Sequence, residues 1–235
     1  MKSQIIGSFG EFVVACDAFE AFADQTIFRG QPVKGNLIPS VARWNHELDS
    51  TDVEIEMLNE IKVLGASLLS GTESDLDLLV KAQHFGLKTR LLDWTSNPLA
   101  ALWFACVNAE PNDADGYVYA LDVDTFLLGA ESYEKSPFQV AKTGVLRPRL
   151  TNERILAQHG WFTLHRYSTR DRKFVPLEKN PDTRGRLYEF RIPAAQTRDM
   201  LRALDKFGVS ARTLFPDLNG LCLYLNRKSS HLLYV

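Results

Sequence analysis

Apolar residues recur at helical spacing in three parts of the chain. Phe12, Cys16 and Phe19 follow one another at intervals of three or four residues, which predicts an amphipathic helix over residues 11–22. The same spacing, interrupted by charged residues, predicts helices over 47–69 and 73–85. Thr72 or Ser74 can cap the start of the helix over 73–85, and Gly86 follows its end, where a left-handed residue is favoured.

Short apolar runs bounded by turn residues predict the strands, at 25–29, 89–94, 116–123, 161–167 and 186–193. A helix is predicted over 194–207 with Gly208 as its stop, and a loop or short helix over 124–136. The segment 213–225 holds the turn FPDLNG, and a final strand is expected at 221–225. Strands and helices do not alternate strictly, so we expect one α+β domain, a split mixed or antiparallel sheet flanked by helices.

The segment 97–107 predicts a buried helix. Asn97 is a good N-cap residue, and Pro98 suits the first helical position, where its missing N–H is no loss. The sequence LAALWFACV that follows is apolar nearly all round, so this helix is expected in the core, with Cys106 as a packing residue.

Composition limits the class of protein. The 235 residues fit one large domain or two small ones, and because no Ser, Gly or Pro-rich linker divides them, one domain is predicted. The net charge of −2 gives no support to nucleic-acid binding, although a local basic patch stays open. Three distant cysteines without a CxxC pair indicate the reducing cytosol. The start of the chain lacks the apolar core of a signal peptide, and the longest apolar run, 99–107, is too short to cross a membrane, which takes about 20 residues.

Several chemistries lack their motifs. GxxxxGK[ST] and GxGxxG are absent, so neither a P-loop nor a Rossmann phosphate cradle is predicted. HExxH and GxSxG are absent as well. His159 and His165 could share one face of a strand, but no further ligands can be placed beside them, so no metal site is predicted.

Three polar segments are unusual for a scaffold. In the first, FRGQ at 28–31, Arg29 at a strand end can project into a cleft, while Gly30 lets a ligand approach the backbone and Gln31 follows. The planar guanidinium suits a phosphate or pyrophosphate. The alternative is a buried arginine–carboxylate pair that holds the sheet.

The second segment runs from Gln83 and His84 to residues 89–96. It brings polar and aromatic groups to the start of the buried helix, where an anion can bind; they are Arg90, Asp93, Trp94, Thr95 and Ser96. Trp94 could stack on a base or a nicotinamide ring. The alternative is that His84 caps its helix, Arg90 pairs with Asp93 and Trp94 belongs to the core.

The third segment is 152–162. Glu153 precedes a predicted strand, and a carboxylate there can stabilise a positive centre or bind a sugar hydroxyl. Gln158 and His159 follow it. The alternative is a solvated surface formed by Glu153 and Arg154.

These segments carry a family resemblance. FRGQ at 28–31, LIPS at 37–40, QHFGLKTRLLDWTSNPLAALWFA at 83–105, ERILAQHGWFTLH at 153–165 and LFPDLNG at 214–220 together resemble the FRG domain. The family is named for its Phe-Arg-Gly motif, and the likeness extends over about residues 25–225, so the whole chain is interpreted as one FRG domain. The family implies little about function.

A more distant likeness is to mono-ADP-ribosyltransferases of the Arg–Ser–Glu type. Phe28-Arg29-Gly30 is similar to their aromatic-Arg-Gly strand, and residues 93–98 to their STS strand before an apolar helix. Asp93-Trp94 stands where the first Ser-Thr would be, which leaves Thr95 in register. Glu153, with Gly160 and Phe162 downstream, looks like their glutamate block.

This resemblance implies NAD⁺ as substrate and no metal. It implies Arg29 for the pyrophosphate or the adjoining ribose, and Thr95 or Ser96 for supporting Glu153 and the sugar. It implies Glu153 for the ribose hydroxyl and the developing cation. We therefore expect an ADP-ribosyltransferase or NAD⁺ glycohydrolase with an unknown acceptor, suited to a role as a cytosolic toxin or anti-phage effector. The expected cleft residues are Arg29, His84, Arg90, Asp93, Thr95, Ser96, Glu153 and Gln158.

Two alternatives stay open. The same cleft could serve a non-catalytic module that binds a nucleotide or a partner, because Asp93-Trp94 departs from the transferase pattern. It could also serve an NAD-independent hydrolase or nuclease that uses His84, Asp93, Gln158 and His159.

Overall fold

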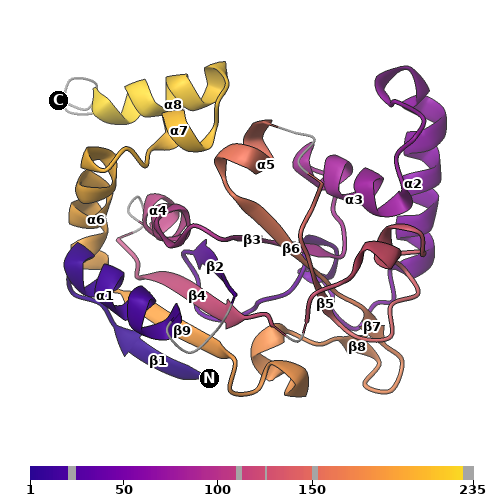
Figure 1. Cartoon of the computed structure of the whole chain (residues 1–235), viewed down its shortest axis with the longest axis horizontal. Coiled ribbons are helices and arrows are strands. Elements are labelled where there is room, and N and C mark those ends of the chain that lie inside the picture. Colours follow the sequence, from indigo (N-terminus) through magenta and orange to yellow (C-terminus); the bar gives the residue numbers. More distant parts are fainter. Residues whose placement is uncertain (21–24, 110–112, 125, 150–152, 230–235) are drawn as a thin grey trace.

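A seven-stranded mixed sheet forms the centre of the protein (Figure 1). The computed structural model describes residues 1–20, 25–109, 113–124, 126–149 and 153–229. The strand order is β1-β9-β4-β2-β3-β6-β5, in which β1 runs parallel to β9 and the other neighbours are antiparallel. The strands are β1 Lys2–Ile5, β2 Thr26–Gln31, β3 Leu91–Thr95, β4 Gly116–Asp122, β5 Gly144–Leu146, β6 Gly160–Leu164 and β9 Leu187–Ile192. A separate two-stranded hairpin, β7 Tyr167–Ser168 and β8 Lys173–Phe174, follows β6.

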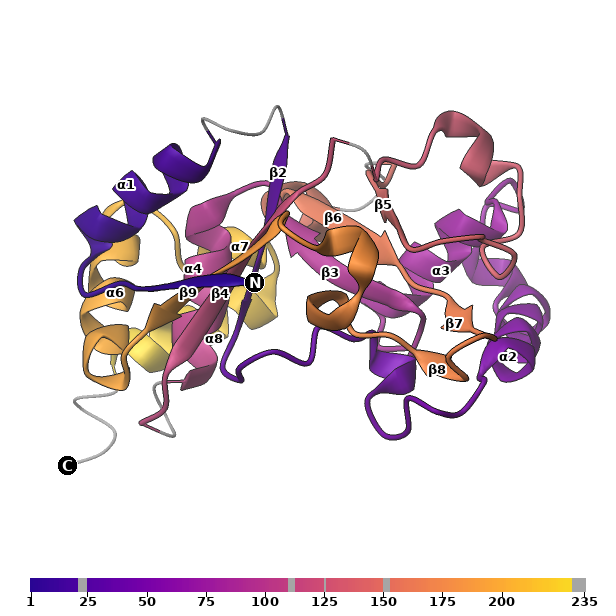
Figure 2. The same cartoon turned by 90° about the horizontal axis from the view of Figure 1, so that it is seen from below.

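Helices gather at the two ends of the sheet. Figures 1 and 2 show α1 and α6 at one end and α2 and α3 at the other. The helices are α1 Phe9–Glu20, α2 Thr51–Leu64, α3 Asp75–His84, α4 Pro98–Ala109, α5 Glu153–Ala157, α6 Ala194–Lys206, α7 Ala211–Leu214 and α8 Leu218–Lys228. The predicted α+β class, with a mixed sheet and flanking helices, is confirmed.

The two faces of the sheet bury different clusters because successive strand residues point to opposite sides. On one face Phe28, Val118 and Phe190 pack under α4, and α4 contacts α6. Cys106 is buried there, as predicted. On the other face Ile27, Tyr119 and further apolar residues form a second cluster, closed by Leu37 and Leu177. The helix α4, apolar nearly all round, is buried as its composition predicts.

The prediction of a final strand at residues 221–225 is wrong. The expected final strand is the middle of α8, whose N-cap Asp217 accepts a hydrogen bond at Oδ1 from the Gly220 N–H at 2.8 Å. Leu221, Leu223 and Leu225 alternate like strand residues, but they remain 37–47% exposed on a helix. The segments β1, β5 and α5 were not predicted. The helix expected over 47–69 is shorter, since α2 ends before Gly65.

Asn97 caps α4 as predicted. Its Oδ1 accepts hydrogen bonds from the N–H groups of Leu99 at 3.0 Å and Ala100 at 3.4 Å. We expect Asn97→Ala to lower the free energy of unfolding by about 1 kcal/mol, because these N–H groups lose their acceptor. Urea denaturation measures this difference. Asn97→Asp keeps an acceptor and serves as the control, and equal stability of Asn97→Ala and the wild type would contradict the capping role.

Candidate functional site

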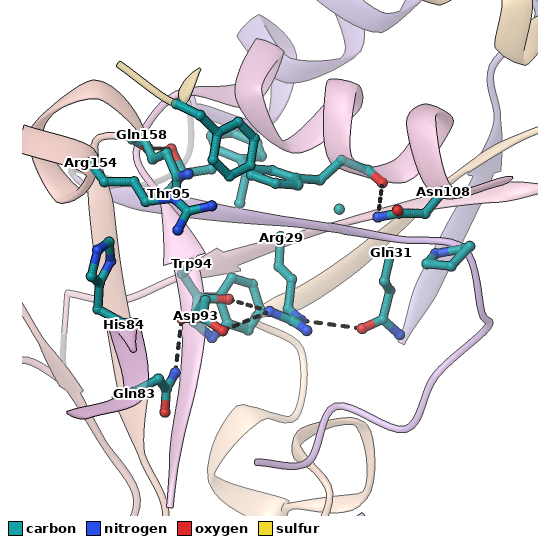
Figure 3. Close-up of a pocket in the computed structure, with 15 residues that line it drawn as sticks. Arg29, Gln31, Gln83, His84, Asp93, Trp94, Thr95, Asn108, Arg154 and Gln158 are labelled. Carbon is teal, nitrogen blue, oxygen red and sulfur yellow. Dashed lines mark hydrogen bonds and ion pairs between the residues drawn. The ribbon is translucent and has the colours of Figure 1, made fainter. Parts of the chain in front are cut away.

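A cavity opens where β2 and β3 separate. Among the described residues, these strands pair at Phe28 and Thr95 alone, so the rest of β3 is paired with β6 but has no ladder partner on its β2 side. The cavity measures about 370 Å³ (Figure 3). Its walls come from β2, β3 and α4, the end of α3, and the segments around α5 and α7. The lining residues are Phe28, Arg29, Gly30, Gln31, Pro32, Gln83, His84, Asp93, Trp94, Thr95, Phe104, Asn108, Arg154, Gln158 and Phe215.

Arg29 bridges the gap between the strands. Its Nη1 donates to the backbone oxygen of Asp93 at 2.7 Å, and its Nε donates to Gln31 Oε1 at 3.2 Å (Figure 3). The guanidinium therefore satisfies a carbonyl group that the separated strands leave without a ladder partner. The side chain is 14% exposed. Burial lowers the pKa of Arg29 to about 10, against the opposing effect of Asp93, so the group is cationic at neutral pH.

Gly30 lines the cavity, but helix packing explains its missing side chain. A Cβ atom at Gly30 would lie 1.7 Å from the backbone oxygen of Ala101 in α4. The interpretation that this glycine admits a ligand to the backbone is thus replaced by close contact between β2 and α4. Phe28 is fully buried beneath the same helix. In the FRG tripeptide, Phe28 and Gly30 pack against α4, and Arg29 supplies the charged side chain of the cavity.

Asp93 supplies the negative charge of the site. It is the one carboxylate that lines the cavity within the described ranges, and its side chain is 62% exposed. Its Oδ1 accepts a hydrogen bond from Gln83 Nε2 at 2.8 Å, and its Oδ2 lies 3.9 Å from Arg29 Nη1. Gln83 is oriented in turn by the hydroxyl of Thr89, which donates to its Oε1. A hydrogen-bonded carboxylate beside a cation is held in place and open to a ligand.

His84 lines the cavity beside Asp93. Burial, followed by the charge of Arg154, lowers the pKa of His84, while Asp217 and Asp93 oppose the shift. The imidazole is therefore mostly neutral at pH 7 and can accept a proton.

An aromatic and cationic wall was not predicted from the sequence. The rings of Phe104 and Phe215 lie 6.0 Å apart, edge to face, and the guanidinium carbon of Arg154 lies 4.2 Å from the centre of the Phe215 ring. Gln158 belongs to the same wall and donates from Nε2 to the backbone oxygen of Leu214 at 3.1 Å. Asn108 also lines the cavity. The sequence could have indicated this residue, because it is the polar residue at the end of an otherwise apolar helix.

Arg90 is not a cavity residue. It is 1% exposed, and its Nη2 and Nε bind the carboxylate of Glu54 at 2.9 and 3.2 Å. Phe138 covers the guanidinium at 4.7 Å. The predicted cofactor contact is therefore corrected to a structural ion pair, and its partner is Glu54 in α2 rather than Asp93. No periodic pattern links Glu54 to Arg90, because their contact arises from tertiary packing.

Trp94 and Thr95 face the cavity with little free surface. Trp94 is 3% exposed, and its indole N–H donates to Thr163 Oγ1 at 3.1 Å. It belongs to the apolar cluster of the sheet, so a stacking role is not available to the ring as it lies. Thr95 is 5% exposed, and its hydroxyl donates to the backbone oxygen of Gln158 at 2.6 Å. It ties β3 to the turn before β6.

Ser96, Glu153 and His159 do not line the cavity. All three are exposed, and Glu153 begins α5 instead of preceding a strand directly. Its neighbour Arg154 occupies the wall. Catalysis by Glu153 therefore stays a prediction that rests on sequence resemblance.

Two further properties concern metals and membranes. Within the described ranges, no three histidine, cysteine or acidic side chains gather closely enough to hold a metal ion. In the same part of the chain, no helix combines the length and the apolar character that crossing a bilayer requires.

Comparison with known families supports the sequence resemblance. Residues 24–114 match the family model of the FRG domain. This part of the chain is similar to the FRG domain. The comparisons with curated proteins and with solved structures found no match. The matched FRG segment supplies Arg29, Asp93 and Phe104 to the cavity, whereas Arg154 and Phe215 lie beyond it.

Proposed function

We propose that this cavity binds NAD⁺ and that the protein uses it as a substrate, as an ADP-ribosyltransferase or NAD⁺ glycohydrolase. One observation carries the proposal: two arginines, Arg29 and Arg154, share a cavity of about 370 Å³ with the aromatic pair Phe104 and Phe215. A dinucleotide offers the matching groups, an anionic pyrophosphate and flat rings. The volume lies in the usual range of small-molecule sites, about 300–1,000 Å³.

The order of strands supports the same proposal. The three blocks that resemble Arg–Ser–Glu transferases fall on or just before β2, β3 and β6, which are neighbours in the sheet. Blocks that are distant in sequence thus converge on the region where the cavity opens. Arg29 comes from the first block and Asp93 from the second. Gln158, in the turn before β6, comes from the third.

Cleavage of NAD⁺ breaks the bond between ribose C1′ and the nicotinamide nitrogen. The electron pair leaves with nicotinamide, which becomes neutral, and positive charge develops on the ribose. We assign the stabilisation of this charge to the Asp93 carboxylate. Neutral His84 would take the proton from the attacking water or from a hydroxyl of the acceptor. Arg29 would bind the pyrophosphate.

Nicotinamide release from NAD⁺ by the purified protein tests the proposal, with and without cell extract. We expect Asp93→Asn to reduce the rate by about 10²–10³, because an electrostatic group at the reacting centre is lost. Arg154→Gln should weaken NAD⁺ binding by about tenfold or more, which corresponds to a lost charge-assisted hydrogen bond. Arg202→Gln, an exposed arginine of α6, is the matched control and should change neither value.

Glu153→Gln separates the two candidate carboxylates. The structure leads us to expect near-normal turnover for this variant. Loss of turnover in Glu153→Gln but not in Asp93→Asn would transfer the role to Glu153.

Absence of nicotinamide release by the folded wild-type protein, with and without extract, would contradict NAD⁺ cleavage. If cleavage occurs, growth arrest on expression, relieved by Asp93→Asn, would support a toxin or anti-phage role.

The second candidate function is a non-catalytic nucleotide-binding module. It is favoured by the position of Glu153 outside the lining of the cavity. Saturable NAD⁺ binding in calorimetry, without nicotinamide release, would identify it. The NAD-independent hydrolase has weaker support, because His84 and Asp93 share the cavity but His159 does not line it.

A further inference from the structure

A second cavity, of about 580 Å³, is lined by basic side chains. It lies among the loop over 36–46, the hairpin of β7 and β8, and the segment 175–181. Five cationic side chains line it against one carboxylate, although the chain as a whole carries a net charge of −2. The cations are Arg43, Arg166, Arg170, Lys173 and Lys179, and the carboxylate is Asp171.

Most of these cations have no anionic partner among the residues that the structure describes. Within the described residues, Arg43, Arg166, Lys173 and Lys179 form no ion pair; Arg170 contacts the adjacent Asp171 at 3.3 Å. A hydrogen bond from Ser168, with the nearby cations, lowers the pKa of Asp171, so this one carboxylate is already ionised and engaged. Clustered like charges repel one another, and a bound anion would remove that cost.

The frame of this basic cavity is fixed by the backbone. The N–H of Phe174 donates to the backbone oxygen of His46 at 2.7 Å. The hydroxyl of Tyr167 donates to the backbone oxygen of Glu47 at 3.1 Å. Phe174 is fully buried against Ile38. Figure 2 shows the hairpin at the end of the molecule that carries α2, away from α1 and α6. The loop and the hairpin that carry these cations are therefore fixed to each other.

Trp44 is an exposed aromatic residue next in the chain to the lining residue Arg43. It stands between Arg43 and His46, two lining residues, and it is 96% exposed. A tryptophan that packs on nothing gains no burial free energy from folding. Indole rings beside cationic grooves are the surfaces on which single-stranded nucleic acids stack their bases.

We propose that the basic cavity binds single-stranded nucleic acid, with phosphates among its cations and a base on Trp44. A single strand fits better than a duplex, because a flexible backbone can enter a concave site and its bases are free to stack. A phosphopeptide would use the cations but gives no reason for an exposed indole. The inference goes beyond the proposed function and does not depend on it, since Trp44 and the hairpin cations lie outside the NAD⁺ cavity lining.

Fluorescence anisotropy of a labelled oligonucleotide of about 12 nucleotides, a length within known single-strand sites, tests the proposal. The full chain is titrated, without NAD⁺, into single-stranded RNA, single-stranded DNA and the corresponding duplex. We expect single strands to bind at least about tenfold more tightly than the duplex. The slope of the logarithm of the association constant against the logarithm of the salt concentration should be about −0.7 for each phosphate contacted.

Variants locate the binding. Trp44→Ala should weaken binding by about tenfold or more, and Trp44→Phe should retain most of it. Arg166→Gln and Lys173→Gln should each weaken binding and reduce the salt slope by about 0.7. Arg202→Gln, at the other end of the molecule, is the charge-matched control and should bind as the wild type. Thermal denaturation of each variant establishes that it is folded.

Three results would overturn the proposal. One is no anisotropy change for either single strand at about 50 mM salt, where phosphate contacts are strong. Another is binding that none of the Trp44, Arg166 and Lys173 variants alters, since the site would then lie elsewhere. The third is loss with the charge variants but not with Trp44→Ala, together with equal binding of a phosphopeptide. That pattern would identify a general anion site without base recognition.

Discussion

Glu54→Ala is expected to lower the free energy of unfolding by about 3–5 kcal/mol at neutral pH, the range found when one partner of a buried ion pair is removed. The side chains of Glu54 and Arg90 are 2% and 1% exposed. Glu54 accepts from the Arg90 guanidinium and also from the Arg90 backbone N–H at 2.9 Å and the Ser50 hydroxyl at 2.8 Å. Its removal leaves a buried guanidinium without a counter-charge. Equilibrium denaturation in urea measures the loss.

Two controls isolate burial as the cause. Lys62→Ala breaks an exposed pair whose atoms lie 2.6 Å apart, and it should cost no more than about 1 kcal/mol because solvent screens the charges. The double change Glu54→Leu with Arg90→Met removes both charges and should recover much of the stability. A similar small loss for Glu54→Ala and Lys62→Ala would show that the buried pair is not a structural support.

Gly30→Ala is expected to destabilise the protein by about 3 kcal/mol or more, at the upper end of the costs of overpacking. The added Cβ would meet the Ala101 backbone oxygen at 1.7 Å and the Ala105 nitrogen at 2.6 Å. Both atoms belong to the backbone of α4, so no rotamer change can relieve the clash. The helix must move from β2, which also displaces Phe104 from the cavity wall. Denaturation in urea and the affinity for NAD⁺ should therefore change together.

Gly10→Ala is the matched control for this substitution. Gly10 lies in α1, and a Cβ there would meet nothing within 4 Å. Alanine is the better helix former, so this variant should be neutral or slightly more stable. If Gly30→Ala behaves like Gly10→Ala, the close contact between β2 and α4 is not required.

The sequence predicts those features that depend on local patterning. Periodicity places α1 and α3, the stop at Gly208 places the end of α6, and the cap at Asn97 places α4. The alternation in 221–225 misleads, because the N-cap at Asp217 starts a helix that overrides the strand-like pattern. Local propensity is a weak guide when a cap and tertiary contacts decide the outcome.

Some residues of the candidate site could likewise be predicted from the sequence, and others could not. Arg29, His84, Asp93 and Gln158 were predicted to face a cleft, and they line the cavity. Arg154 was missed because Glu153 and Arg154 are neighbours on a short helix, and the sequence does not show which one faces inward. The ring of Phe215, from a distant segment, meets the arginine. Contacts of this kind are set by the packing of distant segments, which no periodic pattern records.

The cavity is assembled from two portions of the chain. Residues 24–114, the FRG segment, contribute Arg29 and the carboxylate of Asp93, whereas Arg154, Gln158 and Phe215 form a wall from beyond that segment. This segment alone lacks that wall and also the strands β4 and β6, which flank β2 and β3 in the sheet. Changes of ligand preference are best sought in the outer wall, where substitutions leave the β2–α4 packing untouched.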